Sequence, residues 1–139
     1  MKNTQPLRVF VVEDAQIARE HIAALLDAVD GLEVVGYAAD AEEAIERILA
    51  DRPDAVVADV RLMRGTGFDV LRAVRGNAPE IDVYMLTNLS TPPYREHAAR
   101  LGARDLFDKS FEFEWLRDAL QRRAYAMATE ALAPEAIAF

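Results

Sequence analysis

The amino-acid sequence predicts an α/β protein with a doubly wound, five-stranded parallel sheet and helices on both faces. Short runs of branched and aromatic residues alternate along the chain with segments in which apolar residues recur at helical spacing. Glycines and prolines fall between the two kinds of segment, where turns are needed. The strand-like runs are apolar almost throughout, which is typical of strands buried on both faces. These patterns favour strand–helix units joined into one parallel sheet.

Five segments are expected to form the strands. In chain order they read LRVFVV, LEVVGYA, DAVVAD, DVYMLT and RDLFD, and they cover residues 7–12, 32–38, 54–59, 82–87 and 104–108. We expect the flavodoxin-like strand order 2-1-3-4-5. In this order the carboxyl ends of the first and third strands flank the crevice in which ligands bind.

The helices are expected between these strands and after the last one. Two of them show apolar residues at near-helical spacing: Ile17, Ile22, Leu25, Leu26 and Val29 in the first, and Ala41, Ala44, Ile45, Ile48 and Leu49 in the second. The last helix should begin near Phe111 and end where Pro134 interrupts it. Its apolar face consists of Phe113, Leu116, Ala119, Leu120 and Ala124, which we expect to pack on the core.

The length of 139 residues fits one domain with a real core, and a second folded domain is not expected. We assign residues 5–128 to this domain and residues 129–139 to a C-terminal helical extension or tail. The alanine-rich end of the last helix, beyond Arg123, exceeds what one domain face needs. It is either a fraying tail or a helix that forms a homodimer or packs on a partner.

Composition narrows the classes of function. A formal net charge of -8 argues against direct nucleic-acid binding, which needs a basic surface that neutralises phosphates. The absence of cysteine excludes disulfides, thiolate metal sites and cysteine nucleophiles. The apolar runs are too short to cross a membrane, and no signal peptide is apparent. We therefore expect a cytoplasmic protein that does not bind membranes.

Carboxylates gather where two neighbouring strands end. Glu13 and Asp14 follow the first strand, and Asp59 ends the third. Two unit charges about 4 Å apart repel by roughly 4 kcal/mol at an effective dielectric near 20, so a cation is expected, and an all-oxygen donor set suits Mg²⁺. Thr87 and Lys109 end the fourth and fifth strands and add a hydroxyl and a positive charge. Taken alone, Asp14 could instead serve as a helix N-cap.

These residues and their surroundings resemble the receiver domain of two-component response regulators, the family that includes the stand-alone chemotaxis regulators. The resemblance rests on the Glu13–Asp14 pair, on DVRLMRGTG from Asp59, on MLTN around Thr87 and on GARDLFDKS around Lys109. It extends from residue 7 to about residue 123. Four separate positions agree in residue type, order and spacing, which makes the match specific.

The resemblance implies a phosphorelay function. Asp59 would be the phosphoacceptor, taking a phosphoryl group from a histidine kinase or a histidine phosphotransfer protein. Asp14, Asp59 and the main-chain carbonyl of Arg61 would bind Mg²⁺, with Glu13 acting partly through water. The added charge at Asp59 would then select an active arrangement of the loop that follows the fourth strand.

The resemblance also assigns roles to the other two strand ends. Lys109 would pair with Asp59 and then with a phosphoryl oxygen. Thr87 would hydrogen-bond another phosphoryl oxygen and draw its loop inward. The output would be altered contact with a downstream protein, through the face made by the fourth helix, fifth strand and fifth helix.

Several positions depart from the family pattern. Met63 stands where receivers commonly have proline, and Ser110 stands where proline follows the lysine, often after a cis peptide bond. A cis bond before serine costs about 3 kcal/mol, so we expect either a trans bond with a shifted loop or strain. The inward-turning aromatic is replaced by Leu106, while Phe107 should face the opposite side of the sheet. Asn88, in place of a small residue, is expected to crowd the phosphate site or hydrogen-bond within it.

Three functions are therefore considered. The first is a response regulator that catalyses at most its own phosphorylation and dephosphorylation. The second is a binding module that keeps the receiver fold and signals without phosphate. The third is a metal-dependent phosphatase or phosphotransferase with an Asp nucleophile. The complete set of acidic, hydroxyl and lysine residues favours the response regulator. Metal-dependent phosphatases with an Asp nucleophile typically need a second acid/base Asp two residues after it, and Arg61 occupies that position.

Overall fold

Ten elements alternate between strand and helix in the computed structural model, which describes residues 5–136. They are β1 (Leu7–Val12), α1 (Gln16–Asp27), β2 (Leu32–Ala38), α2 (Ala41–Asp51), β3 (Ala55–Ala58), α3 (Gly67–Asn77), β4 (Asp82–Thr87), α4 (Pro92–Arg100), β5 (Asp105–Asp108) and α5 (Phe113–Ala136). All strand pairs are parallel and the order is β2-β1-β3-β4-β5. The predicted fold class and strand order are confirmed.

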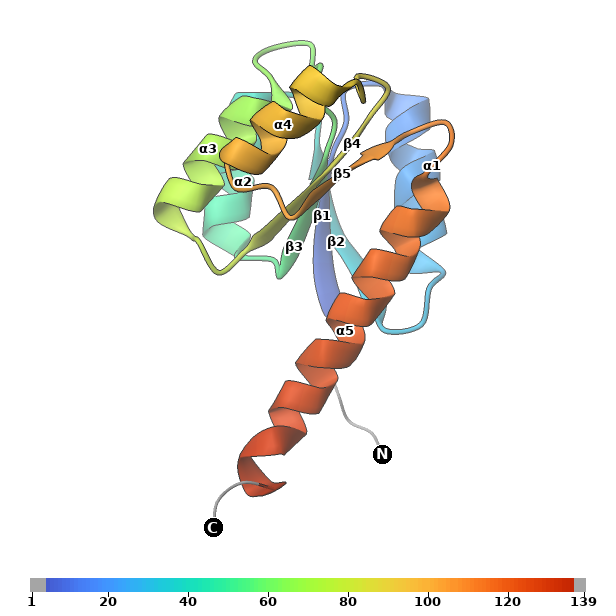
Figure 1. The fold of residues 1–139 in the computed structure, drawn as a ribbon, viewed down its shortest axis with the longest axis vertical. Helices are drawn as coiled ribbons and strands as arrows, with labels where there is room; N and C mark the ends of the chain where they lie inside the picture. The colour runs from blue at the N-terminus through green and yellow to red at the C-terminus, as the bar shows by residue number, and fades with distance from the viewer. Residues whose placement is uncertain (1–4, 137–139) are drawn as a thin grey trace.

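The helices cover the two faces of the sheet, as Figure 1 shows, and each face has its own core. One core packs α2, α3 and α4 on the sheet and includes Phe10, Ile48 and Leu71. The other packs α1 and α5 and includes Leu26 and Leu120. Each such side chain contributes about 1.5–3 kcal/mol when it is fully buried. The sheet thus becomes a rigid base for the loops at its carboxyl edge.

Successive side chains of β5 point to opposite faces of the sheet, so its two apolar residues lie in different cores. Leu106 joins the core beneath α2, α3 and α4, and Phe107 joins the core beneath α1 and α5. Both side chains are buried, at 3% and 6% exposure. The expectation that Phe107 points away from Leu106 is confirmed.

The last helix differs from the expectation at both ends. It begins at Phe113 rather than near 111, and it continues past Pro134 to Ala136, so the prediction that Pro134 ends it is wrong. A proline this close to a helix end removes only one backbone hydrogen bond, which the helix tolerates. The helix runs on beyond the sheet in Figure 1 and crosses the expected boundary at 128 without a break. Residues 137–139, part of the expected tail, lie outside the described residues.

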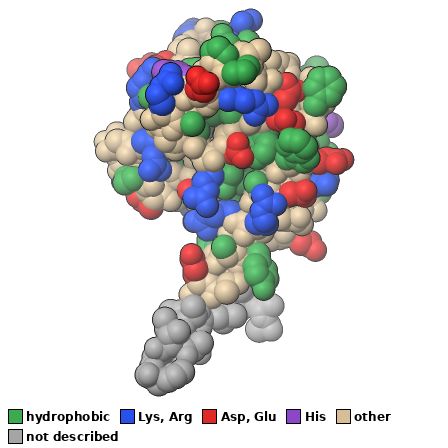
Figure 2. All heavy atoms as spheres, in the orientation of Figure 1, with side chains coloured by type: hydrophobic (Ala, Val, Ile, Leu, Met, Phe, Trp, Pro, Cys, Tyr) green, Lys and Arg blue, Asp and Glu red, His purple; other side chains and the backbone are tan. Residues whose placement is uncertain are grey.

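The surface carries both signs of charge. Figure 2 shows basic and acidic side chains interspersed over the face that α5 crosses, rather than one continuous basic stripe. None of the helices within residues 5–136 combines the length and apolarity needed to cross a bilayer.

Gly67 allows a close approach at the start of α3. Its N–H donates to the carbonyl of Val60 at 2.8 Å, and Thr66 beside it forms a capping box with Asp69. A Cβ atom at Gly67 would overlap the main-chain oxygen of Asp59 and come within 2.8 Å of Met85 Cε. The loop after β3 can therefore fold back onto the backbone of Asp59 only because position 67 lacks a side chain.

We expect Gly67→Ala to lower the free energy of unfolding by about 1–3 kcal/mol, the usual cost of overpacking a tight site. Gly76→Ala is the matched control in the same helix, because a Cβ there meets nothing within 4 Å. It should be neutral or stabilising by up to about 1 kcal/mol. Urea unfolding of both variants measures the difference, and equal effects would show that the close approach at Gly67 has no energetic importance.

Candidate functional site

The chemically active residues meet at the carboxyl edge of the sheet. Glu13 and Asp14 follow β1, Asp59 follows β3, Thr87 ends β4 and Lys109 follows β5. These four strands are neighbours in the sheet and run in the same direction, so their carboxyl ends lie side by side. The structure brings together five positions that are spread over most of the chain.

The Lys109 ammonium group joins two carboxylates. Its Nζ donates to Glu13 Oε1 at 2.6 Å and to Asp59 Oδ2 at 2.7 Å. All three side chains are largely buried, with exposed fractions of 3% for Glu13, 11% for Asp59 and 22% for Lys109. Two negative charges therefore share one positive charge in a site that water reaches poorly.

Burial and this charge imbalance perturb both partners. Burial raises the pKa of Glu13, and the charge of Asp59 adds to that effect, although the hydrogen bonds from Lys109 and from the Ala15 N–H act in the opposite direction. For Lys109, burial alone would lower the pKa, but the hydrogen bonds and charges of Asp59 and Glu13 outweigh it and raise the pKa above its ordinary value. Lys109 thus stays protonated, and Glu13 ionises less readily than an exposed glutamate.

Asp14 has no hydrogen-bond or ion-pair partner among the described residues. The N-cap of α1 is Ala15, and no side chain caps this helix, so the reading of Asp14 as a helix cap is wrong. The Ala15 N–H instead donates to Glu13 Oε2 at 3.1 Å. Within residues 5–136, no hydrogen bond or ion pair engages the half-buried Asp14 carboxylate. Asp14 is therefore available to a ligand.

The oxygen atoms near Asp59 suit a hard cation. Asp14 supplies a free carboxylate, Asp59 keeps Oδ1 free because Lys109 binds Oδ2, and the carbonyl of Arg61 accepts no hydrogen bond from the described residues. Among these residues no three acidic or histidine side chains form a metal cluster. Mg²⁺ is commonly held by one or two carboxylates with water, so two carboxylates and one carbonyl fit it. The expectation that Glu13 acts on Mg²⁺ partly through water stays a prediction; both of its oxygens already accept hydrogen bonds.

Thr87 is buried at the end of β4, and its hydroxyl faces its own loop. Thr87 Oγ accepts a hydrogen bond from the Leu89 N–H at 3.1 Å. The Lys109 N–H donates to the Thr87 carbonyl at 3.0 Å, so the main chains of these two residues are joined. This hydrogen bond continues the pairing of β4 and β5 into the site.

Asp108 organises the turn that follows β5. Within residues 5–136 there is no cis peptide bond, so the bond before Ser110 is trans. Asp108 Oδ1 accepts the N–H groups of Ser110 and Phe111 at 2.8 and 3.0 Å, and Oδ2 accepts the Ser90 hydroxyl at 2.6 Å. Of the two expected outcomes, a trans bond with a shifted loop or strain, the structure shows a trans bond, and the Asp108 side chain shapes the loop that follows. An aspartate at a strand end followed by serine is the sequence signal that predicts such a turn.

Two of the residues that differ from the receiver pattern, Met63 and Asn88, lie at the surface. Met63 is 73% exposed in the loop between β3 and α3. Asn88 is also exposed, and its Oδ1 accepts the Ser110 hydroxyl at 3.1 Å. Asn88 therefore ties the loop after β4 to the loop after β5.

Arg19 is a residue near the site that the sequence did not reveal. Its Nη1 donates to the main-chain oxygen of Glu13 at 2.9 Å, and its guanidinium lies 5.2 Å from the centre of the Tyr37 ring. Its Nε is buried without a hydrogen-bond partner among the described residues. Arg19 holds the backbone that carries the acidic pair, a role that no local pattern in α1 indicates.

Comparison with known proteins gives one family. The model of the response regulator receiver domain matches residues 9–121. The protein-glutamate methylesterase/protein-glutamine glutaminase 3 of Geobacter sulfurreducens is 34% identical over 84% of this chain and 33% of its own length. The response regulator MprA of Mycobacterium tuberculosis is 34% identical over 91% of this chain and 56% of its own length. This chain therefore spans 33% and 56% of the lengths of these two curated relatives.

Solved structures agree with the observed fold. The response regulator domain of Thermotoga maritima CheB superposes with a TM-score of 0.77 at 25% identity, over 90% of this chain and 98% of that chain. The receiver domain of the NarL regulator from Mycobacterium tuberculosis gives a TM-score of 0.80 at 27% identity, over 87% of this chain and 98% of that chain.

The raised pKa of Glu13 has a consequence for stability. The folded protein binds a proton at Glu13 more tightly than the unfolded chain does, so stability is lost as the pH rises above 4.5 and this group ionises. We expect the unfolding free energy of the wild type, minus that of Glu13→Gln, to fall between about pH 4.5 and neutral pH. Urea unfolding without divalent cations measures it.

Glu46→Gln is the matched control, because it removes one negative charge from an exposed position on α2. A difference between wild type and Glu13→Gln that stayed constant with pH, or rose, would contradict the assignment of a raised pKa to Glu13.

Proposed function

This chain belongs to the response regulator receiver domain family, and from this premise we propose that it accepts a phosphoryl group on Asp59 in a Mg²⁺-dependent reaction and signals through altered contacts with a partner protein. The observation that carries the proposal is the Lys109 ammonium group bound between Glu13 and Asp59 at the carboxyl edge of the sheet. Phosphoryl transfer depends mainly on positioning and on neutralising charge, and this arrangement supplies both.

The chemistry assigns the nucleophile to Asp59. A carboxylate oxygen of Asp59 attacks the phosphorus of the donor, a phosphohistidine or a small molecule such as acetyl phosphate. The new bond joins this oxygen to phosphorus. The bond from phosphorus to the donor breaks, and its electron pair leaves on the imidazole nitrogen or on the oxygen of acetate. The product is an aspartyl phosphate at Asp59.

Neighbouring groups offset the charge of the transferred group. Lys109 already lies within hydrogen-bond distance of Asp59, and one of its N–H groups can donate a hydrogen bond to a phosphoryl oxygen. Asp14, Asp59 and the carbonyl of Arg61 would hold Mg²⁺, which supplies the remaining positive charge when bound.

Thr87 links phosphorylation to a change of shape. Its Oγ now accepts the Leu89 N–H, which leaves the hydroxyl proton free to be donated to a phosphoryl oxygen. Turning the hydroxyl toward that group gives up the bond to Leu89 and draws the loop after β4 inward. The charge added at Asp59 would thereby favour one of two arrangements that the protein already samples.

The partners are proposed to be proteins. A histidine kinase or a histidine phosphotransfer protein would supply the phosphoryl group, and a downstream protein would read the altered surface. The mixed charges seen on the face that α5 crosses support a protein partner rather than nucleic acid.

Replacing the nucleophile tests the reaction directly. We expect wild-type protein incubated with acetyl phosphate and Mg²⁺ to gain the mass of one phosphoryl group, and Asp59→Asn to gain none, because the amide is a poor nucleophile. Intact-mass spectrometry measures both. Asp118→Asn, an exposed aspartate on α5, is the control and should be labelled like the wild type. Labelling of Asp59→Asn would show that another residue is the acceptor.

Replacing Asp14 tests the metal site. We expect Asp14→Asn to weaken Mg²⁺ binding by about tenfold or more, equivalent to about 1.4 kcal/mol, because a charged oxygen ligand is lost. Isothermal titration calorimetry with MgCl₂ measures the affinity, with Asp118→Asn again as the control. An unchanged affinity would remove Asp14 from the set of metal ligands.

A further inference from the structure

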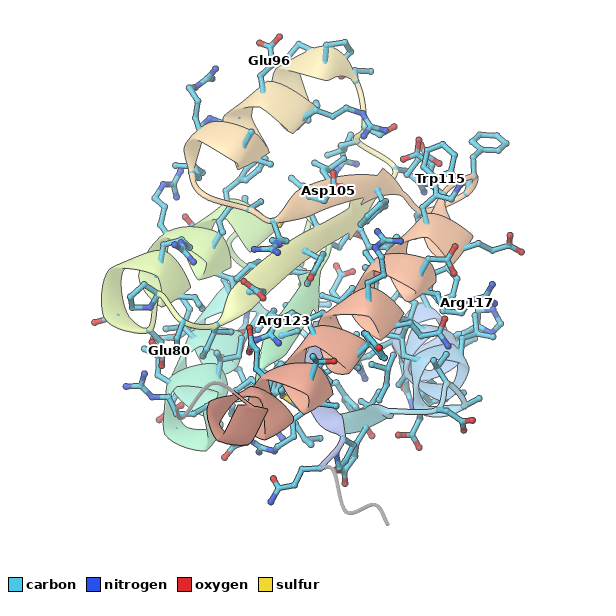
Figure 3. The ribbon with its side chains drawn as sticks, turned by 60° about the horizontal axis from the view of Figure 1, so that its bottom comes forward. Glu80, Glu96, Asp105, Trp115, Arg117 and Arg123 are labelled. Atoms are coloured by element: carbon cyan, nitrogen blue, oxygen red, sulfur yellow. The ribbon has the colours of Figure 1, made fainter. Side chains whose placement is uncertain are left out.

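The strand β5 lies at one edge of the sheet, and its outer side has no neighbouring strand within residues 5–136. Figure 3 shows it between α4 and α5, with Asp105 at its start and Trp115 in the first turn of α5. Backbone groups on such an edge need partners, and an open edge is also a surface on which another protein can pair. How this edge is closed therefore bears on what a partner can recognise.

Side chains close the edge at Leu106 and Asp108. The Leu106 N–H donates to Asp105 Oδ1 at 2.8 Å, and the Leu106 carbonyl accepts Arg95 Nη1 at 2.8 Å. The Asp108 N–H donates to Glu112 Oε1 at 2.8 Å, and the Asp108 carbonyl accepts the Glu112 N–H at 2.8 Å. All four backbone groups are thus satisfied without a second strand.

Arg95 connects this edge to the loop that follows β4. Besides its bond to Leu106, Arg95 donates from Nε to the Ser90 carbonyl at 2.7 Å and from Nη2 to Glu112 Oε1 at 3.0 Å. We call Arg95 and its partners Ser90, Leu106 and Glu112 the Arg95 clamp. The Ser90 hydroxyl, through its 2.6 Å bond to Asp108, fastens the same loop a second time.

We propose that Arg95 is a positioning residue that holds the loop after Thr87 in its unphosphorylated arrangement and closes the edge of β5, and that phosphorylation of Asp59 releases both contacts together. This inference rests on the proposed phosphorylation. When the Thr87 hydroxyl donates to the phosphoryl group and its loop is drawn inward, as proposed above, the segment that carries Ser90 is displaced. Because one guanidinium binds both Ser90 and Leu106, movement of the loop opens the edge.

The Leu106 side chain is packed in the core, so only its backbone is available to the loop after β4. Its carbonyl, rather than its side chain, takes part in the clamp. Hydrogen bonds also favour the ionised carboxylates around it: the Ser90 hydroxyl lowers the pKa of Asp108, and the Asp108 N–H lowers the pKa of Glu112.

Hydrogen exchange followed by NMR tests the release. The probe is beryllofluoride with Mg²⁺, an aspartyl-phosphate mimic. We expect the Arg95 Nε–H, which donates to Ser90, to exchange at least about fivefold faster when the mimic is bound, which is a small allosteric coupling. The Leu106 amide is an internal control, because its N–H donates to the neighbouring Asp105 and only its carbonyl binds Arg95. Unchanged exchange at Arg95 with the mimic bound overturns the proposal.

Variants test the coupling in the other direction. Arg95→Gln should bind the mimic about fivefold more tightly, because the clamp no longer opposes the active arrangement. Arg95→Lys should lie between the wild type and Arg95→Gln, since lysine can keep one of the three bonds. Arg52→Gln is the matched control, because it breaks a surface ion pair with Glu80 of similar length, 3.1 Å. Equal affinity of Arg95→Gln and wild type overturns the proposal.

A variant that does not fold, and a failure of the proposed phosphorylation, can each be distinguished from a failure of the proposal for Arg95. If Arg95→Gln does not fold, Glu112→Gln takes its place, because it removes the charge that holds Arg95 while keeping an acceptor for the Asp108 N–H. If the mimic leaves the wild-type spectrum unchanged and acetyl phosphate leaves the mass unchanged, the proposed phosphorylation itself fails, and the proposal for Arg95 fails with it. A mimic that binds without altering the clamp refutes only the role of Arg95.

Discussion

The structure is organised around a shortage of positive charge. Glu13 and Asp59 share the single ammonium group of Lys109, and Asp14 beside them has no cationic partner among the described residues. Like charges at close range repel by several kcal/mol where water is scarce, so Lys109 offsets part of the repulsion between the carboxylates of Glu13 and Asp59. The sheet brings these charges together from three strand ends.

Around this site, the loops that follow β4 and β5 are hydrogen-bonded to one another. The main chains of Thr87 and Lys109 are hydrogen-bonded, Asn88 binds Ser110, and Ser90 binds Asp108. These bonds join the loop after β4 to the loop after β5 at several points. A change in either loop therefore has a limited number of outcomes, which is the condition for a two-state response rather than a gradual deformation.

The strands, their order and the residues at the strand ends could be predicted from the sequence. Apolar runs fix which segments are buried strands, and residues at strand ends such as Asp59 and Thr87 inherit their positions from the strand order. The partner of a side chain is harder to predict, because it depends on rotamers and on distant backbone. Glu13 accepts a hydrogen bond from Lys109, and Asp14 does not cap α1. Arg95 donates to backbone carbonyls on two other segments. No local sequence pattern indicates any of these contacts. The close approach at Gly67 likewise appears only in three dimensions.

The distance along the chain between Glu13 and Lys109, 96 positions, has a consequence for biosynthesis. The first carboxylates of the site leave the ribosome long before the lysine that neutralises them, and the pairing of β5 with β4 is among the last contacts that the chain can make. Until that contact forms, the acidic residues remain an unassembled set on a partial sheet. The complete site, with Lys109 beside Glu13 and Asp59, therefore exists only after β5 has joined the sheet.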